Sequence, residues 1–431
     1  MRTISKLALA LALTGGVGGL TITAPAAAQK KKDEKPGLKL SPEVLKPAQA
    51  AQPLLAAGDA AGAEPLVAQI EAAVKTDDDK YIAAALRYEL EQRKIIAAQQ
   101  ANPNAPVNET SLAAPLDALL ASPSTPAADK GKYAYRRGAL AYNGKQYPVA
   151  VQYFTQAKQL GYTEPNLNLQ IARAKVEGGD VAGGLADLDA AIDAQTAAGQ
   201  KAPEDYYRYG IARANAAKLG PQTSAWLAKY VAAYPTSKNW RDAIVTYGLS
   251  SGSVVQVTDP QKIDLFRLMR ATRSLADQND YVEYADELQK RGLPAEAQAV
   301  LKEGQAAGKI PASNATAKAL LSESAAAVRA EGSLAPLEKR ANAAADGKLA
   351  ASTADAYLGM DEFSKAIALY RTALQKGGVD ADEVNTRLGI ALARSGDKAG
   401  AKTAFAAVRS APRSGIARLW TAYLDAPAPT A

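Results

Sequence analysis

Small and apolar residues recur along this chain with a period of about 34 to 35 residues. The first copies are Gly138, Gly144, Ala150, Phe154 and Ala157, and their counterparts one period later are Ala172, Gly178, Gly184, Leu188 and Ala191. Nearer the C-terminus, the series Ala354, Tyr357, Ala366, Tyr370 and Ala373 is followed one period later by Gly389, Leu392, Ala401, Phe405 and Val408. Positions spaced in this way share one face of a helix, and a repeat of this length predicts stacked helical hairpins.

A second pattern marks the turn inside each hairpin. Ala63, Val67 and Ile70 lie at offsets of +5, +9 and +12 from Gly58, and the same offsets separate Gly396 from Ala401, Phe405 and Val408. Glycine ends a helix by accepting left-handed backbone angles. The aspartate that follows, Asp180 or Asp397, can then start the second helix. Two distant segments therefore predict the same hairpin.

This pattern resembles the tetratricopeptide repeat, a helix–turn–helix of about 34 residues. That repeat has a small residue at position 8, small residues at positions 20 and 27, and an aromatic at position 24. Gly138, Ala150, Phe154 and Ala157 match these positions, whereas the proline expected at position 32 is mostly missing or displaced. The resemblance covers residues 44–411. It implies an all-α solenoid of roughly 8 to 10 hairpins in two or three superhelical stretches.

Members of this family bind peptides or protein segments on the concave face built by the first helix of each hairpin. One subgroup holds a C-terminal carboxylate with Lys at position 5 and Asn at position 9. Here the corresponding pairs are Tyr135 and Ala139, Leu169 and Arg173, and Thr386 and Ile390. That carboxylate clamp is therefore absent, and the resemblance implies no particular ligand.

Residues 1–28 have the pattern of a secretory signal peptide. Arg2 and Lys6 form a positive region, Leu7 to Leu13 an apolar region, and the alanines before Gln29 a cleavage site after Ala28. An uncleaved membrane anchor is the alternative, because no charge lies between Leu7 and Ala28. The glycines and Pro25 in that stretch favour the signal peptide. We therefore expect a bacterial protein that is periplasmic or secreted. We expect no stable membrane insertion after the signal peptide is cleaved.

Composition and turn residues divide the remaining chain into segments. These are a flexible lead-in (29–43), N-terminal degenerate hairpins (44–122), central repeats (131–249), C-terminal repeats (262–411) and a disordered tail (425–431). The β-branched run Val254 to Thr258 is expected to be a loop. A degenerate hairpin is expected at 313–346, because Ala297 and Ala366 lie about two periods apart.

The sequence contains no cysteine and no histidine. Disulfides, thiol nucleophiles, thiolate metal sites and catalytic triads that use histidine are thereby excluded. Two acidic runs, Asp77–Asp79 and Asp286–Glu287, raise the question of metal or acid–base chemistry. The first has neither the spacing nor the glycine of a calcium loop, so we expect solvated residues that cap helices. We expect no catalytic residues, no metal site and no cofactor. A carboxylate-dependent hydrolase on a helical scaffold is a remaining alternative.

The formal net charge of +7 overstates the basic character of the chain. Arg2 and Lys6 belong to the expected signal peptide, and several lysines between Lys30 and Lys39 belong to the lead-in. The rest of the chain is close to neutral and has no dense basic stripe. Nucleic-acid binding, which depends on such a stripe, is not expected.

Tyrosines are concentrated between Tyr133 and Tyr247, which makes this segment the best candidate for partner binding. Tyr135 and Tyr142 lie two helical turns apart and share a helix face. Arg173, Tyr209 and Arg213 occupy the neighbouring first helices. Tyrosine and arginine are enriched at interaction hot spots, which suggests a groove for an acidic peptide. The alternative is that the tyrosines pack between hairpins and the arginines are solvated or paired locally.

These observations favour a periplasmic scaffold that binds a protein or peptide partner during envelope assembly, secretion or quality control. An envelope glycan- or peptidoglycan-binding module associated with cell-wall enzymes is the alternative, with tyrosines stacking on sugar rings. The pattern specifies neither the identity of the partner nor an oligomeric state.

Overall fold

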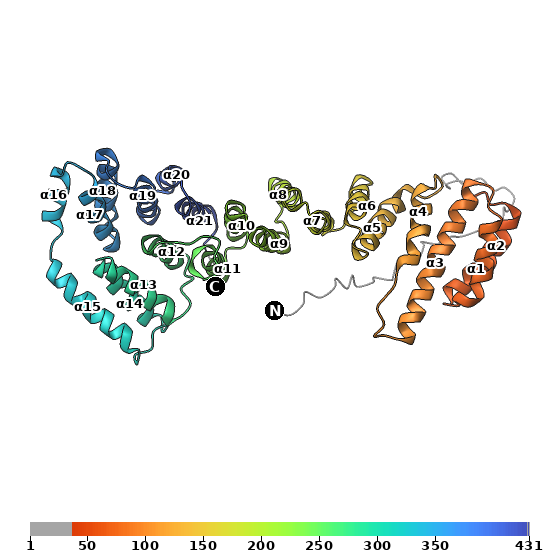
Figure 1. Cartoon of the computed structure of the whole chain (residues 1–431), viewed down its shortest axis with the longest axis horizontal. Coiled ribbons are helices and arrows are strands. Elements are labelled where there is room, and N and C mark those ends of the chain that lie inside the picture. Colours follow the sequence, from red (N-terminus) through yellow and green to blue (C-terminus); the bar gives the residue numbers. More distant parts are fainter. Residues whose placement is uncertain (1–36, 429, 431) are drawn as a thin grey trace, which may run out of the picture. The chain divides into compact units, whose positions relative to one another are not determined.

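The computed structural model describes residues 37–428 and residue 430. The expected signal peptide and most of the lead-in lie outside the described residues. The described chain is all-α and consists of helices joined by short connections (Figure 1). Its sole β-type pairing, between Thr236 and Thr430, is an isolated bridge and not a strand of a sheet. The chain separates into two compact units, Met1–Asp187 and Leu188–Ala431.

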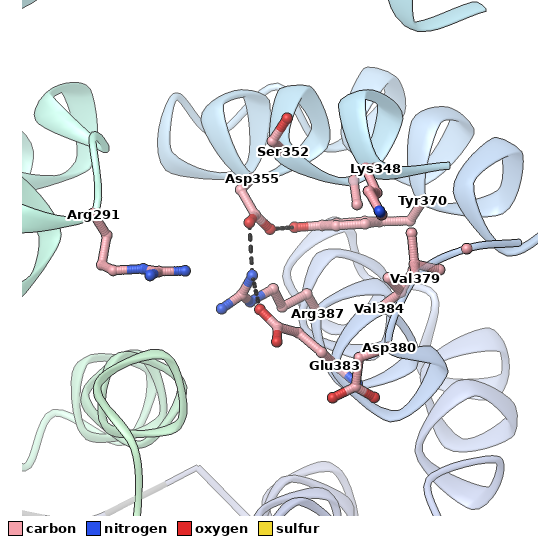
Figure 2. Close-up of a pocket in the computed structure, with 12 residues that line it drawn as sticks. Arg291, Lys348, Ser352, Asp355, Tyr370, Val379, Asp380, Glu383, Val384 and Arg387 are labelled. Atoms are coloured by element: carbon pink, nitrogen blue, oxygen red, sulfur yellow. Dashed lines mark hydrogen bonds and ion pairs between the residues drawn. The ribbon is translucent and has the colours of Figure 1, made fainter. Parts of the chain in front are cut away.

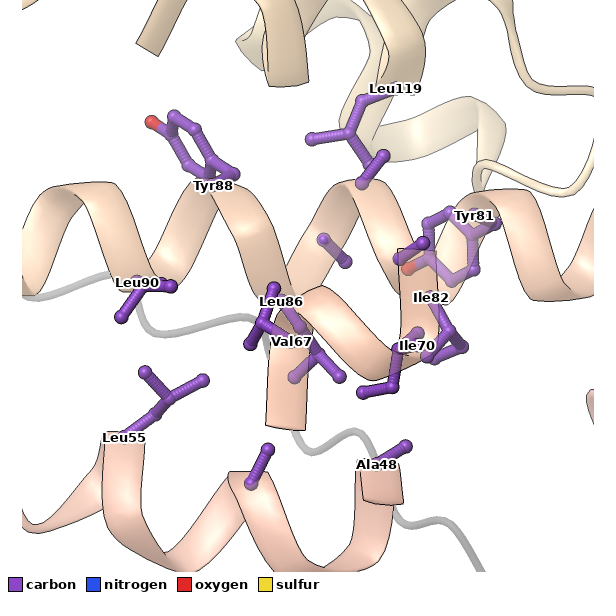
Figure 3. Close-up of a cluster of buried hydrophobic side chains, with 14 of the residues drawn as sticks. Ala48, Leu55, Val67, Ile70, Tyr81, Ile82, Leu86, Tyr88, Leu90 and Leu119 are labelled. Atoms are coloured by element: carbon purple, nitrogen blue, oxygen red, sulfur yellow. The ribbon is translucent and has the colours of Figure 1, made fainter. Parts of the chain in front are cut away.

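Unit 1 is built from consecutive helices that pack against their neighbours in sequence. They are α1 (Pro42–Ala56), α2 (Ala60–Ala72), α3 (Asp77–Ala101), the 3-10 turn η1 (Thr110–Leu112), α4 (Ala113–Ala121), α5 (Ala127–Asn143), α6 (Tyr147–Gln159), α7 (Leu167–Glu177) and the start of α8 (Val181–Ala197). Figure 3 shows the core between the first three helices, where Leu55, Val67, Ile70, Ile82 and Leu86 are completely buried. Burial of this apolar surface stabilises the hairpins, because each helix alone has only one apolar face.

Unit 2 contains the end of α8 and the helices that follow it. They are α9 (Glu204–Ala216), α10 (Gly220–Ala233), α11 (Ser237–Ile244), the π turn η2 (Val245–Leu249), α12 (Asp259–Ala271), α13 (Gln278–Lys290), α14 (Pro294–Ala306), α15 (Ala315–Glu331), α16 (Ala335–Ala343), α17 (Lys348–Gly359), α18 (Phe363–Lys376), α19 (Ala381–Ser395), α20 (Lys398–Ala406) and α21 (Arg413–Asp425). Helix α21 packs against α19 and α20 and also against α10 and α12, so the last helix closes onto the first part of the unit (Figure 1).

The predicted turn chemistry is confirmed at three hairpins. Gly58, Gly179 and Gly396 have φ of 82°, 98° and 93°. The aspartate after each glycine accepts a hydrogen bond from the backbone N–H three residues later, at 2.8 to 2.9 Å. The glycine therefore ends the first helix and the aspartate caps the second.

In two hairpins a glycine of the first helix packs against the aromatic residue of the second. A Cβ atom at Gly138 would lie 2.7 Å from the ring of Phe154, and one at Gly389 would lie 2.4 Å from the ring of Phe405. Both distances are shorter than van der Waals contact, so the two helices of each hairpin approach closely only because the first carries no side chain there.

The structure differs from the predicted segments in several places. Residues 413–425 form α21, which lies beyond the last predicted repeat. The predicted disordered tail begins at the last residue of this helix, and the backbone of Thr430 exchanges hydrogen bonds with Pro235 and Ser237 at 3.0 and 2.8 Å. The division between the two units falls after Asp187, inside the predicted central stretch of 131–249.

Candidate functional site

The sequence-predicted tyrosines of unit 1 lie on α5 and contact other aromatic rings. The ring of Tyr135 lies 5.5 Å from that of Phe154 and 5.2 Å from that of Tyr162, measured between centroids. Burial raises the pKa of the Tyr135 hydroxyl to about 12. Tyr142 contacts Tyr147 edge to face at 5.6 Å. Both side chains remain partly exposed.

The other three predicted residues are divided between the units. Arg173 is half-buried on α7 of unit 1. In unit 2, the guanidinium of Arg213 lies 5.2 Å from the centroid of the Tyr209 ring, one turn earlier on α9. The structure therefore brings Tyr209 and Arg213 together, and it places Tyr135 and Tyr142 on one helix. A single groove formed by all five residues stays a prediction.

A groove of about 650 Å³ in unit 1 runs between α2, α3 and α4. Small residues line much of it: Ala83 and Ala84 of α3, and Ala114, Ala118 and Ala121 of α4. The first two are almost completely buried, at 6% and 7% exposure, whereas the three alanines of α4 are exposed. Such a surface lets the backbone of a second segment approach closely, because no large side chain holds it away.

The charged residues at the edge of this groove are paired with one another. Arg87 binds Glu71 at 2.5 Å and Glu64 at 3.0 Å, and Lys80 binds Asp77 at 2.9 Å. The groove therefore offers an apolar surface between compensated charges.

Unit 2 contains a buried network of ionised side chains that was not expected from the sequence. Asp264 of α12 is completely buried and contacts three guanidinium groups, those of Arg413, Arg267 and Arg387, at 2.7, 3.1 and 3.4 Å. Burial alone would raise the pKa of Asp264, but the three arginines outweigh this effect and hold it below the ordinary value. The carboxylate is therefore charged inside the core.

The network continues from α12 to α14 through a two-pronged ion pair. Arg267 donates to both carboxylate oxygens of Glu296, at 3.0 and 2.6 Å, and the Tyr284 hydroxyl donates to the same carboxylate at 2.6 Å. Burial opposes ionisation of Glu296, yet its pKa is lowered to about 2 because Arg267 and Tyr284 stabilise the charged form.

One end of the network forms the wall of a cavity of about 310 Å³ (Figure 2). Asp355 of α17 accepts hydrogen bonds from Arg387 of α19 and from the Tyr370 hydroxyl of α18, each at 2.6 Å. Glu383 of α19 pairs with Arg387 at 2.5 Å. Burial raises the pKa of Asp355, and Arg387 offsets this only in part. The cavity is completed by Arg291, which follows α13, and by Lys348, Ser352 and Asp380, among others.

Neither of the two acidic runs is uniformly solvated, although this was predicted for the first. Asp79 does act at the start of α3, where it takes part in a capping box with Thr76, but it is completely buried. It also accepts hydrogen bonds from the Ser41 hydroxyl and from the backbone N–H groups of Ser41 and Lys75, the latter two at 2.9 and 3.1 Å. Burial would raise its pKa, but these hydrogen bonds lower it to about 2. Asp286 is partly exposed and pairs with Lys290, but it lies inside α13 and does not cap a helix, and Glu287 beside it is buried at 8% exposure.

A signal for the buried network does exist in the sequence. Asp264 and Arg267 interrupt the apolar run from Ile263 to Met269, and all seven residues are buried. Charged residues are rarely buried unless they are paired, so their position inside an apolar run indicates partners elsewhere in the chain. The partners themselves, on α14, α19 and α21, are too distant in sequence to be identified by spacing.

Within the described residues, no group of three or more Asp, Glu, His or Cys side chains is arranged to hold a metal ion. Over the same part of the chain, none of the helices has the length and apolar character needed to cross a membrane.

No protein-family model matches the chain, and no curated protein matches it. Among solved structures, the pentatricopeptide repeat protein PPR10 from maize matches with 14% sequence identity and a TM-score of 0.29, over 87% of this chain and 61% of the maize chain. The APC/C hetero-tetramer Cut9-Hcn1 matches with 12% identity and a TM-score of 0.20, over 87% of this chain and 89% of that chain. This chain thus spans less than two thirds of the maize protein. The assignment of an all-α fold rests on the helices of the described residues and not on these matches.

Proposed function

We propose that this protein is a scaffold that binds a protein or peptide partner on the surfaces of its helical hairpins. The groove between α2, α3 and α4 carries the proposal, because it is about 650 Å³ in volume, lined by alanines and bordered by paired charges. A groove of this kind suits an amphipathic helix or extended segment that places apolar side chains against the alanines. The absence of histidine and cysteine from the sequence favours binding over catalysis.

The proposed setting is the bacterial envelope, with the protein acting in the periplasm or after secretion. The support is the N-terminal pattern of Arg2 and Lys6, the apolar stretch that follows, and the alanines before Gln29. Cleavage after Ala28 would release a protein free to meet partners in assembly, secretion or quality control. Mass spectrometry of the N-terminus of the exported protein tests the cleavage.

A photo-crosslinking amino acid at Ala118 tests the groove directly. Ala118 is exposed on α4 and lines the groove, so a crosslinker there should capture the partner in living cells. Ala68, an exposed alanine on α2 outside the lining, is the matched control and should not capture it. Identical products at both positions, or none at Ala118, would contradict a partner in this groove.

Competition then separates the two classes of partner. Capture at Ala118 should be reduced by peptides from the captured protein and unaffected by soluble peptidoglycan fragments. The reverse result would favour the glycan-binding alternative.

The Tyr/Arg face predicted from the sequence is proposed as an additional contact. If it contributes, the double change Arg173→Ala and Arg213→Ala should lower recovery of the partner from a periplasmic extract. If recovery of the partner were unchanged, the Tyr/Arg face would not contribute to binding.

A further inference from the structure

The cavity of unit 2 is lined by a guanidinium group that uses two of its three nitrogen atoms for contacts with carboxylates. Arg387 is 6% exposed, its Nε atom donates to Asp264, and its Nη1 atom contacts Asp355 and Glu383. Within the described chain, the Nη2 atom of Arg387 makes no hydrogen bond. Arg387 lines the cavity, so an acceptor placed there can receive a charge-assisted hydrogen bond from this nitrogen without disturbing the existing pairs.

A second guanidinium extends toward the same cavity from another wall. Arg291 follows α13 and points toward Arg387 across the opening in Figure 2. Its side chain is exposed and forms no ion pair with any described residue. Lys348, at the start of α17, adds a third cation that is 75% exposed and lies 4.0 Å from Asp346.

The carboxylates that line the cavity are already occupied. Asp355 and Glu383 pair with Arg387. Asp380 caps α19 by accepting hydrogen bonds from the backbone N–H groups of Asp382 and Glu383, at 2.9 and 3.2 Å. Among the charged groups that line the cavity, Arg291 has no described carboxylate within ion-pair distance, and Lys348 has only Asp346 at 4.0 Å.

We infer that this cavity binds a carboxylate group of an acidic peptide segment, held between Arg291 and Arg387 with Lys348 beside them. A planar carboxylate matches the donor geometry of guanidinium groups. A monoanion also meets less repulsion from Asp355, Asp380 and Glu383 than a phosphate dianion would. The inference rests on the proposed binding of peptides and names the chemistry of a partner segment in unit 2.

Binding of a hexaglutamate peptide to the full chain tests this inference. The probe carries fluorescein at its N-terminus and an amide at its C-terminus, and binding is followed by fluorescence anisotropy. Arg291→Gln should raise the Kd about tenfold, because it removes a charge-assisted hydrogen bond without disturbing an existing pair. Arg371→Gln on α18 is the control with the same charge change, since Arg371 is exposed and does not line the cavity; its Kd should stay within about twofold of the wild-type value.

Two further probes distinguish the sources of the anionic group. A hexaglutamine peptide with a free C-terminus should bind with the same dependence on Arg291 if the cavity accepts a terminal carboxylate, and should not bind if it accepts only acidic side chains. Either result supports a carboxylate, provided that one peptide depends on Arg291. Inorganic phosphate is then added at concentrations lower than those of ordinary phosphate buffers. Displacement of every bound peptide at such concentrations would overturn the preference for a carboxylate.

Equal loss of affinity in Arg291→Gln and Arg371→Gln, or no loss in either, would overturn the site. Capture of a partner at Ala118 does not depend on Arg291, so the failure of this inference would leave the proposed scaffold function standing. If no partner were captured at Ala118 while the peptides still bound with a dependence on Arg291, the groove would be contradicted and the cavity would stand.

Discussion

At Asp264 one buried carboxylate contacts three arginines from three different helices. Transfer of an ion from water into a protein interior costs several kcal/mol, and attraction between the charges offsets this only when every partner is in place. The carboxylate therefore fixes the positions of α12, α19 and α21 more than it adds net stability. Removal of a single member of such a network is expected to be far more harmful than its replacement as a whole by apolar side chains.

Asp264→Asn should lower the free energy of unfolding of unit 2 by about 3 to 5 kcal/mol. It removes the one carboxylate that lies among three buried guanidinium groups, and their remaining partners Glu296, Asp355 and Glu383 cannot replace it at that position. Tryptophan fluorescence during chemical denaturation measures this change selectively, since Trp226, Trp240 and Trp420 all belong to unit 2. Asp286→Asn, which breaks the exposed pair with Lys290, is the control and should have no measurable effect. Equal effects of the two substitutions would show that Asp264 is not a structural centre.

The stability of unit 2 should fall as the pH drops below the ordinary pKa of Glu296, which is 4.5. The pKa of Glu296 is about 2 in the folded state, so deprotonation favours folding, and its contribution is complete above pH 4.5 and lost as the pH approaches 2. A difference of this size corresponds to a contribution on the order of 3 kcal/mol. Asp355, whose pKa is raised, acts in the opposite direction because its protonation favours the folded state.

The variant Glu296→Gln isolates this effect. Its unfolding free energy, followed by tryptophan fluorescence between about pH 5 and pH 2, should fall less steeply than that of the wild type. Parallel curves for the two proteins would assign the acid sensitivity to other groups, such as Asp264.

The sequence was least informative about which individual residues come together in the candidate sites. Tyr135 and Phe154 have the spacing of a helical hairpin, and their contact follows from the repeat. The cavity of unit 2 does not follow from the repeat, because Arg291 and Arg387 belong to segments that are far apart in the chain. Spacing determines which residues share a helix face, whereas packing between distant helices depends on the sum of many weak contacts.

Among the elements, the hairpin turn shows how closely the sequence specifies local structure. Gly58, Gly179 and Gly396 have positive φ, as their position before an aspartate predicts. The α5–α6 turn is different, since Gly144 has φ of −77° and the positive angle of 58° falls on Lys145. The repeat pattern identified the turn correctly, and the non-glycine residue at its strained position was not foreseen.

Lys145→Gly should stabilise unit 1 by about 0.5 to 1 kcal/mol. A left-handed conformation costs a residue with a side chain about 1 to 2 kcal/mol, and glycine removes this cost at the expense of a more flexible unfolded chain. Lys145 is exposed, so few contacts are lost. Thermal unfolding followed by far-UV circular dichroism should show the increase.

The reciprocal change Gly58→Lys, at a turn of the same geometry, should destabilise unit 1 by about 1 kcal/mol. If the two substitutions shifted the midpoint in the same direction, backbone strain at these turns would not be the cause.

The close helix pairs follow the same logic at the level of the hairpin. Where the second helix carries the aromatic Phe405, the first has Gly389, and where the second carries the smaller Leu301, the first has Ala285. Ala354 and Tyr370 have the same spacing, so the first position stays small while the second varies between leucine and an aromatic residue. This restriction explains why the period was readable although few positions are identical between repeats.

For the molecule as a whole, the main departure from a simple repeat array is α21. In a solenoid each repeat contacts only its neighbours, and loss of an end unit loosens the array locally. Helix α21 packs against α10 and α12 as well as α19 and α20, and it supplies Arg413 to Asp264. Unit 2 is thereby closed by contacts between segments roughly 150 to 200 residues apart, which a repeat period cannot predict.

A chain ending at Ser410 should therefore lose the cooperative folding of unit 2 as a whole. Ile416, Leu419 and Trp420 of α21 are completely buried, and their burial alone contributes about 5 to 9 kcal/mol. This is comparable to the entire stability of a typical domain. Hydrogen exchange measured by mass spectrometry should show loss of protection in α13 to α18 as well as in the helices that α21 contacts.

A chain ending at Asp425, which keeps α21 and removes only the tail with the Thr430 bridge, is the matched control and should retain protection throughout unit 2. If the chain ending at Ser410 lost protection only in α10, α12, α19 and α20, unit 2 would behave as an ordinary repeat array. Loss that extends through α13 to α18 would instead mean that the buried charges around Asp264 and the closing helix hold the unit together as one cooperative structure, because those helices depend on α21 only through the closed network.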